Sequence, residues 1–347
     1  MRQGRHIILC AGFFIAGNFF GGVVALPAWC FLAAGGLTAF ASLLCRRLPL
    51  MMAAIFLLGA AGLQAGRMPS GEESTPRIVE FASRVQADFS SSLSRYIPEG
   101  DELAVMRALA VGDKSSLTRD IRAVYRQSGA MHLLALSGLH VGIIYALIAA
   151  ALSVFGGSRP VKLLRSIVIL SFLWFYALVS GMSPSISRAV IMITLFEISG
   201  FVGTQRDGPS SVAASALLIT LFSPESPRDI GFQLSYSAVI AIYTIYPRLR
   251  PLLQTGSRVL RYVWDSICIA LSCQCTCGVL GWIYFGTFPR YFLLTNIMAV
   301  PLATIVMYLI AITLLTSTVP ALEPFASHLL QRAIHLLNEL LSVIASL

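Results

Sequence analysis

Residues 132–155 read HLLALSGLHVGIIYALIAAALSVF. The stretch contains no Asp, Glu, Lys or Arg, and it exceeds the roughly 20 apolar residues that a helix needs to cross a bilayer. Its first part is interrupted by His132, Ser137, Gly138 and His140. We therefore predict a membrane-spanning helix that begins with a polar segment containing small residues.

Similar apolar stretches recur along the chain and decide the fold class. Of the 347 residues, 56% are hydrophobic and only 12% are charged, which excludes both an ordinary soluble domain and a disordered chain. With residues 132–155, the stretches that suit a span are 7–26, 28–45, 48–66, 162–181, 186–203, 209–223, 230–247, 266–285, 292–318 and 325–346. We predict an all-α, polytopic transmembrane helical bundle with ten or eleven spans.

Three of these stretches need separate consideration. Residues 209–223 are short for a span, and residues 325–346 are amphipathic, so they either span the membrane or lie along its interface. Arg2 and Arg5 precede residues 7–26, as basic residues precede a signal peptide. The apolar run continues for about 20 residues, which is longer than a signal-peptide core, and we predict a retained helix.

The basic residues predict how the chain lies in the membrane. An N-terminus in the cytoplasm places twelve basic residues in inner loops and leaves three in short outer loops, Arg188, Arg228 and Arg290. The twelve are Arg2, Arg5, Arg46, Arg47, Arg159, Lys162, Arg165, Arg206, Arg248, Arg250, Arg258 and Arg261. This asymmetry follows the positive-inside rule and predicts residues 67–130 outside the membrane. The net charge of +9 therefore indicates mainly how the chain is oriented in the membrane.

Three regions follow from this pattern: a three-span region (1–66), an extracytoplasmic helical linker segment (67–130) and a transmembrane core (131–347). The linker segment carries nine basic and nine acidic residues and is neutral overall. Residues 67–80 are polar, and apolar residues then recur at spacings of three and four from Ile78 to Leu93, which predicts an amphipathic helix on the membrane or on the bundle.

Two further helices are predicted in the same segment. One runs from Asp101 to Val111, with Leu103, Met106 and Leu109 facing inward. The other runs through Ile121, Val124 and Tyr125 after a cap from Ser116 or Thr118.

Candidate site residues are the polar groups that interrupt apolar spans, because an unsatisfied polar group in hydrocarbon costs several kcal/mol. Four interruptions stand out, at residues 128–142, 180–189, 223–237 and 273–301. They contribute Ser137, Gly138, His140, Gly181, Arg188, Gln233, Ser235 and Asn296 as candidates to line a polar path. Each has a structural alternative: a packed helix start, an Arg188 that snorkels to the interface, or polar bonds between helices.

Catalysis and metal binding are two further roles for residues of this kind. Ser137 and His140 lack a visible acidic partner for a hydrolytic triad, and His132 and His140 lack a third metal ligand. The seven cysteines lie in or beside apolar stretches, and Cys275 is expected to point away from Cys273 and Cys277 on a helix. We predict no disulfide framework, no metal site, no cofactor and no enzymatic activity.

The four interruptions, in this order, resemble the ComEC competence family of polytopic inner-membrane proteins. The resemblance rests on Gly112-Asp113-Lys114, on residues 132–142 (HLLALSGLHVG), on Gly181 to Arg188, on residues 229–236 (DIGFQLSY) and on Asn296 to Pro301. It covers residues 95–347 well, and the first three spans fit the family in layout only. It implies an inner-membrane channel that carries one strand of incoming DNA into the cytoplasm during natural transformation.

Two parts often seen in that family have no counterpart in this sequence. The OB-like extracytoplasmic domain is replaced by residues 67–130, and no His-x-His-x-Asp-His run of a metallo-β-lactamase-like domain is present. No phosphate-binding Gly-x-x-x-x-Gly-Lys-Ser/Thr loop is present either. The resemblance therefore implies single-stranded DNA and the lipid bilayer as partners, with separate DNA receptor, nuclease and cytoplasmic ATPase proteins, and leaves a homo-oligomer open.

The sequence leaves alternative functions open. A transporter of a small anionic solute, or a degenerate homologue with a structural role, would use the same polar interruptions. A membrane hydrolase that uses Ser137 and His140 is the third.

Overall fold

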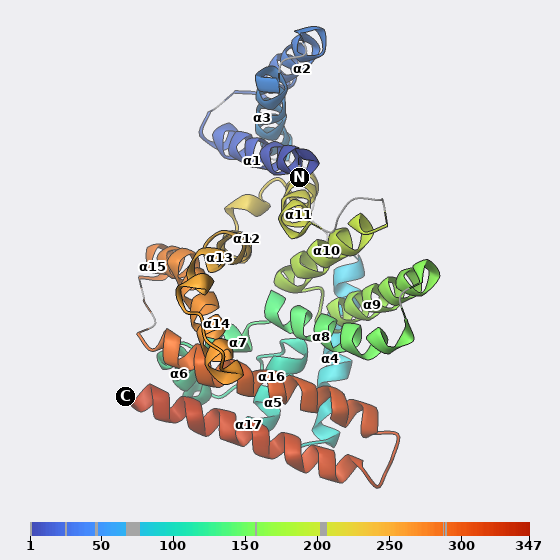
Figure 1. The fold of residues 1–347 in the computed structure, drawn as a ribbon, viewed down its shortest axis with the longest axis vertical. Helices are drawn as coiled ribbons and strands as arrows, with labels where there is room; N and C mark the ends of the chain where they lie inside the picture. The colour runs from blue at the N-terminus through green and yellow to red at the C-terminus, as the bar shows by residue number, and fades with distance from the viewer. Residues whose placement is uncertain are drawn as a thin grey trace. The chain divides into compact units, whose positions relative to one another are not determined.

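The computed structural model describes residues 2–24, 26–45, 48–66, 77–156, 158–201, 207–286, 288 and 290–347. These residues form helices joined by turns, with no strand among them (Figure 1). The chain is an all-α membrane protein, as the apolar pattern predicts. The predicted linker at 67–80 lies outside the described residues up to position 76, and a helix begins at Arg77.

Five helical stretches are long and apolar enough to cross a bilayer, counting the described residues only: His6–Val23, Gly138–Phe155, Arg159–Val179, Arg258–Phe285 and Phe292–Thr316. Three shorter apolar helices accompany them, at Ala28–Ser42, Leu48–Gln64 and Gly208–Phe222. Each of these eight falls on a stretch that the sequence predicts as a span.

The chain divides into two compact units. One comprises Met1–Ser74 and Ile191–Ile240, and the other comprises Thr75–Val190 and Ala241–Leu347. The first unit contains helices α1 (Arg2–Val23), α2 (Ala28–Cys45), α3 (Leu48–Gly66) and α11 (Gly208–Phe222), the later part of α10 (Pro184–Ser199), η3 (Ser226–Arg228) and most of α12 (Ile230–Thr244). We call the first unit the N-terminal unit and the second the core unit.

Helices α1 and α3 of the N-terminal unit pack at backbone contact. A Cβ built on Gly17 would overlap the carbonyl oxygen of Phe56, and one built on Gly59 would overlap that of Phe14. Small residues of this kind let two apolar helices approach closely, which is how helices associate in a bilayer. The sequence Gly17-Asn18-Phe19-Phe20-Gly21 therefore forms a close-packing seam on α1.

A buried polar bridge closes the same unit. The Asn18 side chain is fully buried and donates from Nδ2 to the Pro224 carbonyl oxygen at 2.8 Å. Arg228 donates from Nη1 to Asn18 Oδ1 and from Nη2 to the Asn18 carbonyl oxygen, both at 2.9 Å. The arginine that the sequence places in an outer loop thus ties η3 to α1.

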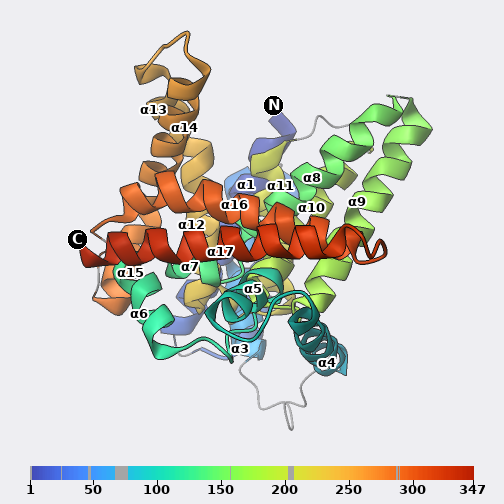
Figure 2. The same cartoon turned by 90° about the horizontal axis from the view of Figure 1, so that it is seen from below.

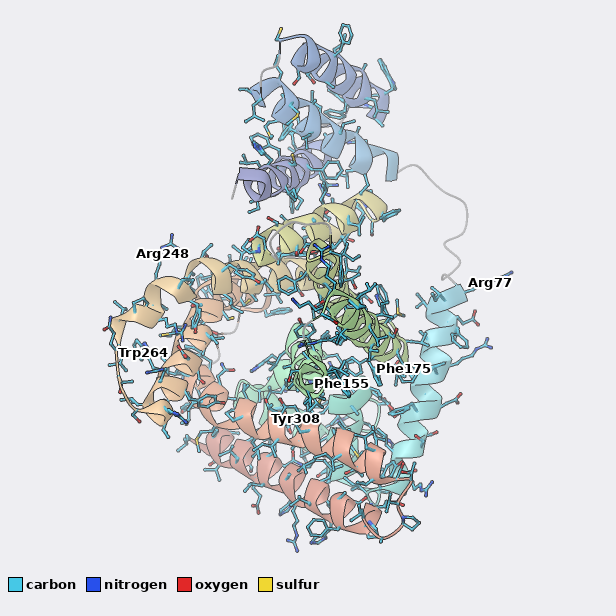
Figure 3. The ribbon with its side chains drawn as sticks, turned by 45° about the vertical axis from the view of Figure 1, so that its right-hand side comes forward. Arg77, Phe155, Phe175, Arg248, Trp264 and Tyr308 are labelled. Carbon is cyan, nitrogen blue, oxygen red and sulfur yellow. The ribbon has the colours of Figure 1, made fainter. Side chains whose placement is uncertain are left out.

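The core unit contains the remaining elements. They are α4 (Arg77–Ser92), η1 (Leu93–Arg95), α5 (Asp101–Val111), α6 (Arg119–Gln127), α7 (Met131–Leu134), α8 (Gly138–Ala151), η2 (Leu152–Phe155), α9 (Arg159–Val179), the first part of α10, α13 (Tyr246–Leu249), η4 (Arg250–Leu252), α14 (Arg258–Cys273), η5 (Gln274–Gly278), α15 (Val279–Phe285), α16 (Phe292–Thr316) and α17 (Glu323–Ser346). Figure 2 shows α17 lying along α16, as Figure 1 does. In Figure 3, Tyr308 marks α16, and Arg248 and Trp264 mark α13 and α14.

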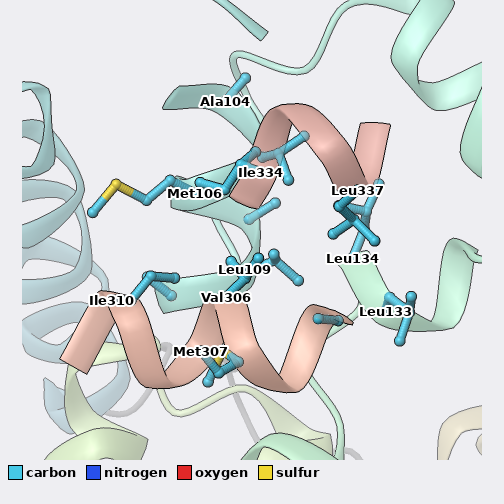
Figure 4. Close-up of a cluster of buried hydrophobic side chains, with 14 of the residues drawn as sticks. Ala104, Met106, Leu109, Leu133, Leu134, Val306, Met307, Ile310, Ile334 and Leu337 are labelled. Carbon is cyan, nitrogen blue, oxygen red and sulfur yellow. The ribbon is translucent and has the colours of Figure 1, made fainter. Parts of the chain in front are cut away.

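Helix α5 is the centre of the core unit, where the sequence predicts a helix within an extracytoplasmic linker segment. Its residues from Leu103 to Val111 are buried, apart from Arg107. Figure 4 shows Met106 and Leu109 among Val306 and Ile310 of α16 and Ile334 and Leu337 of α17. From Leu103 to Val111 every residue except Arg107 is apolar, so the helix is buried on most of its surface. Leu103, Met106 and Leu109 are therefore not its only inward residues.

Helix α17 covers the amphipathic residues 325–346. It is not among the helices that are apolar enough to be candidate spans, and its buried side lies against α16 and the core: Ala326, Leu330, Ile334, Leu337, Leu341 and Ile344. Tyr125 of α6, fully buried, donates a hydrogen bond to Asn338 Oδ1 at 2.9 Å. The segment predicted as extracytoplasmic and the C-terminal helix therefore share one hydrophobic core.

Candidate functional site

The predicted span over 132–155 is broken after α7. Ala135 takes an extended conformation, and α8 begins only at Gly138. Ser137 caps α8: its backbone N–H lies 3.4 Å from His140 Nδ1, and its Oγ lies 3.2 Å from the same nitrogen. The pair forms a reciprocal capping arrangement at the helix start. His140 is buried, with 3% of its surface exposed.

A second break separates α9 from α10. Gly181 has φ +69° and Met182 has φ +51°, and their N–H groups donate to the carbonyl oxygens of Leu178 and Ala177, at 3.0 and 2.8 Å. This is the Schellman pattern that ends a helix at a left-handed glycine. The end of α9 is thereby satisfied by its own backbone, and α10 begins at Pro184.

Arg188 lies in the second turn of α10 and is 6% exposed. Its Nη2 donates to Ser185 Oγ at 3.0 Å. A guanidinium is rarely buried to this degree, because removing a charge from water is costly unless it is compensated. The burial of Arg188 favours a role inside the protein over a side chain that extends to an aqueous interface.

Four of the sequence motifs meet in the core unit. A Cβ on Gly112, which has φ +76°, would meet Leu136 Cδ1 at 2.5 Å, and a Cβ on Gly138 would lie 3.6 Å from Ala189 Cβ. His132 and Asn296 lie close enough to interact. The turn at residues 112–114, both helix starts and the beginning of α16 therefore lie next to one another. Ser137, Gly138, His140, Gly181, Arg188 and Asn296 all belong to this site, which we call the break site.

Gln86 of α4 joins the break site and is missed by the sequence reasoning. Its Nε2 donates to the Val111 carbonyl oxygen at 2.7 Å, and its Oε1 occupies the place where a Cβ on Gly181 would lie. One side chain thus bridges the end of α5 and the turn before α10. Nothing in the sequence around position 86 marks this role, because an exposed polar face of an amphipathic helix has the same composition.

Gln233 and Ser235 belong to a different unit from the other candidates. Both lie on the part of α12 that folds with the N-terminal unit, where Gln233 Nε2 donates to the Pro227 carbonyl oxygen at 3.0 Å. Asp229 caps α12 through a 2.9 Å bond from the Phe232 N–H, as its position predicts.

A buried acid in that unit, Glu197 (1% exposed), is a further residue that the sequence reasoning missed. The sequence does mark Glu197 as a candidate, because it is an acidic residue inside a predicted apolar span.

The described part of the chain contains no group of three or more His, Cys, Asp or Glu side chains placed to hold a metal ion. Cys273 and Cys277 are partly buried and Cys275 is exposed. Residues Gln274–Gly278 form a π-helical turn between α14 and α15, where the sequence predicts a continuous α-helix.

Asp113 organises the turn beside the break site. Its carboxylate accepts hydrogen bonds from Ser90 Oγ, from the Ser115 N–H at 2.9 Å and from Ser115 Oγ at 2.6 Å. Burial alone would raise the pKa of Asp113, but the hydrogen bonds from Ser115 and Ser90 and the charge of Arg107 outweigh it and lower the pKa. A carboxyl whose folded-state pKa is lowered stabilises the fold above its unfolded value of about 3.9, and this stabilisation is lost as the pH falls through the folded value.

We therefore expect Asp113→Asn to lower the free energy of unfolding by about 1 kcal/mol at pH 7. The difference from the wild type should shrink as the pH falls below about 4, where Asp113 of the unfolded chain takes up a proton. It should vanish once the pH is below the lowered pKa of folded Asp113. Denaturant unfolding in detergent micelles at both pH values measures this. Asp120→Asn, on the exposed side of α6, is the control, and an equal loss in both variants would contradict the assignment.

Comparison with known proteins supports the family suggested by the motifs. A family model described as Competence protein matches residues 109–347, which is more than two thirds of the chain. The chain belongs to the competence protein family. The matched region contains every motif of the resemblance to the ComEC competence family, and it begins near the end of α5.

Three curated relatives are similar over part of this competence protein. ComE operon protein 3 of Bacillus subtilis is 31% identical over 142 residues, covering 41% of this chain and 18% of the relative. Competence protein ComA of Neisseria gonorrhoeae is 30% identical over 166 residues, covering 45% and 22%. The uncharacterized protein YcaI of Escherichia coli is 26% identical over 244 residues, covering 66% and 31%. The matches span less than a third of each relative's length. No solved structure matches the chain.

Proposed function

We propose that this competence protein takes part in DNA uptake, as the inner-membrane channel component that carries single-stranded DNA into the cytoplasm during natural transformation. The observation that carries the proposal is the break site. Motifs far apart in the sequence meet where two helices are interrupted and an arginine is buried. A polyanion that crosses a membrane needs backbone donors and cations in place of water, and helix interruptions are where a membrane protein offers them.

The proposed arrangement has the N-terminus in the cytoplasm and residues 67–130 outside. Capture of DNA, removal of one strand and the use of ATP belong, in this proposal, to separate receptor, nuclease and ATPase proteins. The chain itself is proposed not to be an enzyme. The Ser137–His140 geometry supports this part, because the contact between Ser137 Oγ and His140 Nδ1 belongs to the capping box at the start of α8.

A gene deletion tests the proposal against its main alternative. We expect a deletion strain to lose transformation by labelled DNA, and expression of the full chain to restore it. A transporter of a small anionic solute would use the buried Arg188 equally well, because a guanidinium binds carboxylate and phosphate alike. Transformation at the wild-type rate in the deletion strain would therefore reject the DNA channel and favour the solute carrier or a structural role.

A further inference from the structure

Helix α6 presents three arginines on one exposed side. Arg119, Arg122 and Arg126 are exposed, and their spacing of three and four residues places them on one face of the helix. We call them the arginine stripe. Asp120 is one residue from Arg119, which turns it about 100° away from the stripe. Among the residues that the structure describes, none of the three arginines forms an ion pair.

The stripe changes how the neutral segment 67–130 is understood. Its nine acidic and nine basic residues balance only in the sum. From residue 113 to residue 130 the acidic residues are Asp113 and Asp120, and the carboxylate of Asp113 accepts hydrogen bonds from Ser90 and Ser115. Folding therefore gathers unpaired positive charge on α6, which the overall count conceals.

The stripe is held in place. The opposite side of α6 is buried, since Tyr125 is fully enclosed and bonded to Asn338, and Ile121 and Val124 pack on the core. Arg122 Nη2 donates to the Lys114 carbonyl oxygen at 2.6 Å. Burial and the nearby charge of Arg122 lower the pKa of Lys114, which indicates that these two cations are close.

The stripe is joined to the break site through a short path. Lys114, bonded to Arg122, is two residues from Gly112, and Gly112 packs on Leu136 immediately before the Ser137 cap. A strand bound along α6 would therefore lie beside the start of α8. Exposed Ser115, Ser116 and Thr118 lie at the same end of the helix and offer hydroxyl groups of the kind that contact phosphates.

We propose that the arginine stripe of α6 binds the phosphate backbone of single-stranded DNA at the outer end of the break site. This inference rests on the proposed function and deepens it. Arg119 and Arg126 are about 10 Å apart along the helix axis, enough for about three phosphates of a stacked strand. Anionic lipid is the less suitable occupant, because an interfacial helix inserts its apolar face, and the apolar face of α6 is already buried in protein.

The test compares two triple variants of the full chain in nanodiscs of zwitterionic lipid, with a fluorescent single-stranded oligonucleotide as the probe. One variant replaces the stripe (Arg119→Gln, Arg122→Gln and Arg126→Gln). The control replaces three exposed arginines of the predicted inner loops (Arg248→Gln, Arg258→Gln and Arg261→Gln). We expect the slope of log affinity against log salt to fall by about 2 in the stripe variant, because each single-strand phosphate contact contributes about 0.7. The control should keep the wild-type slope.

Three results of the binding experiment would overturn the inference. The slope is the same in the stripe variant and the wild type, or it falls equally in both triple variants. The third result has two parts: the rate of proteolysis within wild-type α6 changes with the lipid charge of the nanodisc, and the stripe variant keeps the wild-type salt slope for DNA binding. This result assigns the stripe to lipid.

Transformation separates a failure of this inference from a failure of the proposed function. Rescue of a deletion strain by the wild type but not by the stripe variant supports both. Equal rescue by the wild type and the stripe variant rejects only the role of the stripe. Transformation of the deletion strain without the gene rejects the proposed function. Orientation is checked with Ser116→Cys, which an impermeant maleimide should label on intact spheroplasts. Labelling only after permeabilisation would also overturn the inference.

Discussion

Replacement of Arg188 by Ala is expected to lower transformation by about two orders of magnitude or more, while the protein still inserts into the membrane. Arg188 is buried at the start of α10, beside the start of α8, and it is the cation of the break site. Loss of a buried, hydrogen-bonded charge costs about 2–5 kcal/mol in a bound state, and each 1.4 kcal/mol is tenfold. Labelled DNA recovered from the cytoplasm measures the effect.

Two further variants separate charge from packing. Arg188→Lys keeps the charge but loses the planar fork that binds phosphate through two bonds, so we expect partial activity. Ser185→Ala removes the hydroxyl that accepts from Arg188 Nη2 and leaves the charge, so its effect should be smaller than that of Arg188→Ala. Equal amounts of each variant in the membrane are the control. Wild-type transformation by Arg188→Ala would reject the assignment.

The second large effect is expected at Gly17 in the N-terminal unit. Gly17→Ala places a Cβ on the backbone carbonyl oxygen of Phe56, and a backbone atom cannot move aside as a flexible side chain can. We expect α1 and α3 to separate, at a cost of about 3 kcal/mol or more. Thermal unfolding and protease resistance of the purified protein measure it.

Gly12 provides the matched control on the same helix. Nothing lies within 4 Å of a Cβ built there, and alanine is about 1 kcal/mol better than glycine in a helix interior. Gly12→Ala should therefore be neutral or stabilising. If both variants are equally stable, the close packing of α1 on α3 is not required for folding.

Local structure was largely predictable from the sequence. Helix α5 begins and ends at the predicted residues, and Thr118 caps α6 by accepting from the Ile121 N–H at 3.3 Å. Such features depend on neighbours three or four residues away, which a sequence displays directly. The same holds for the glycine that ends α9 and for the apolar stretches that became helices.

The convergence of distant motifs was not predictable in the same way. Nothing near Gln86 shows that it bridges Val111 and Gly181, because that depends on the packing of three helices. The family resemblance grouped Gln233 with Arg188 in one set of motifs, and the structure divides these residues between two units. The burial of α5 was hidden for a similar reason: eleven residues are too few for a span, and only the enclosing helices α16 and α17 show that it is a core.

The π-helical turn at Gln274–Gly278 has a consequence for comparing members of this family. Such a turn accommodates one extra residue, and one residue corresponds to about 100° of rotation in an α-helix. The halves of the span on either side of it are therefore out of phase, so a stripe of residues cannot be followed from α14 into α15 by counting in threes and fours. A relative that lacks the turn would align with this chain only if a single-residue gap is allowed inside the membrane segment, where gaps are ordinarily forbidden.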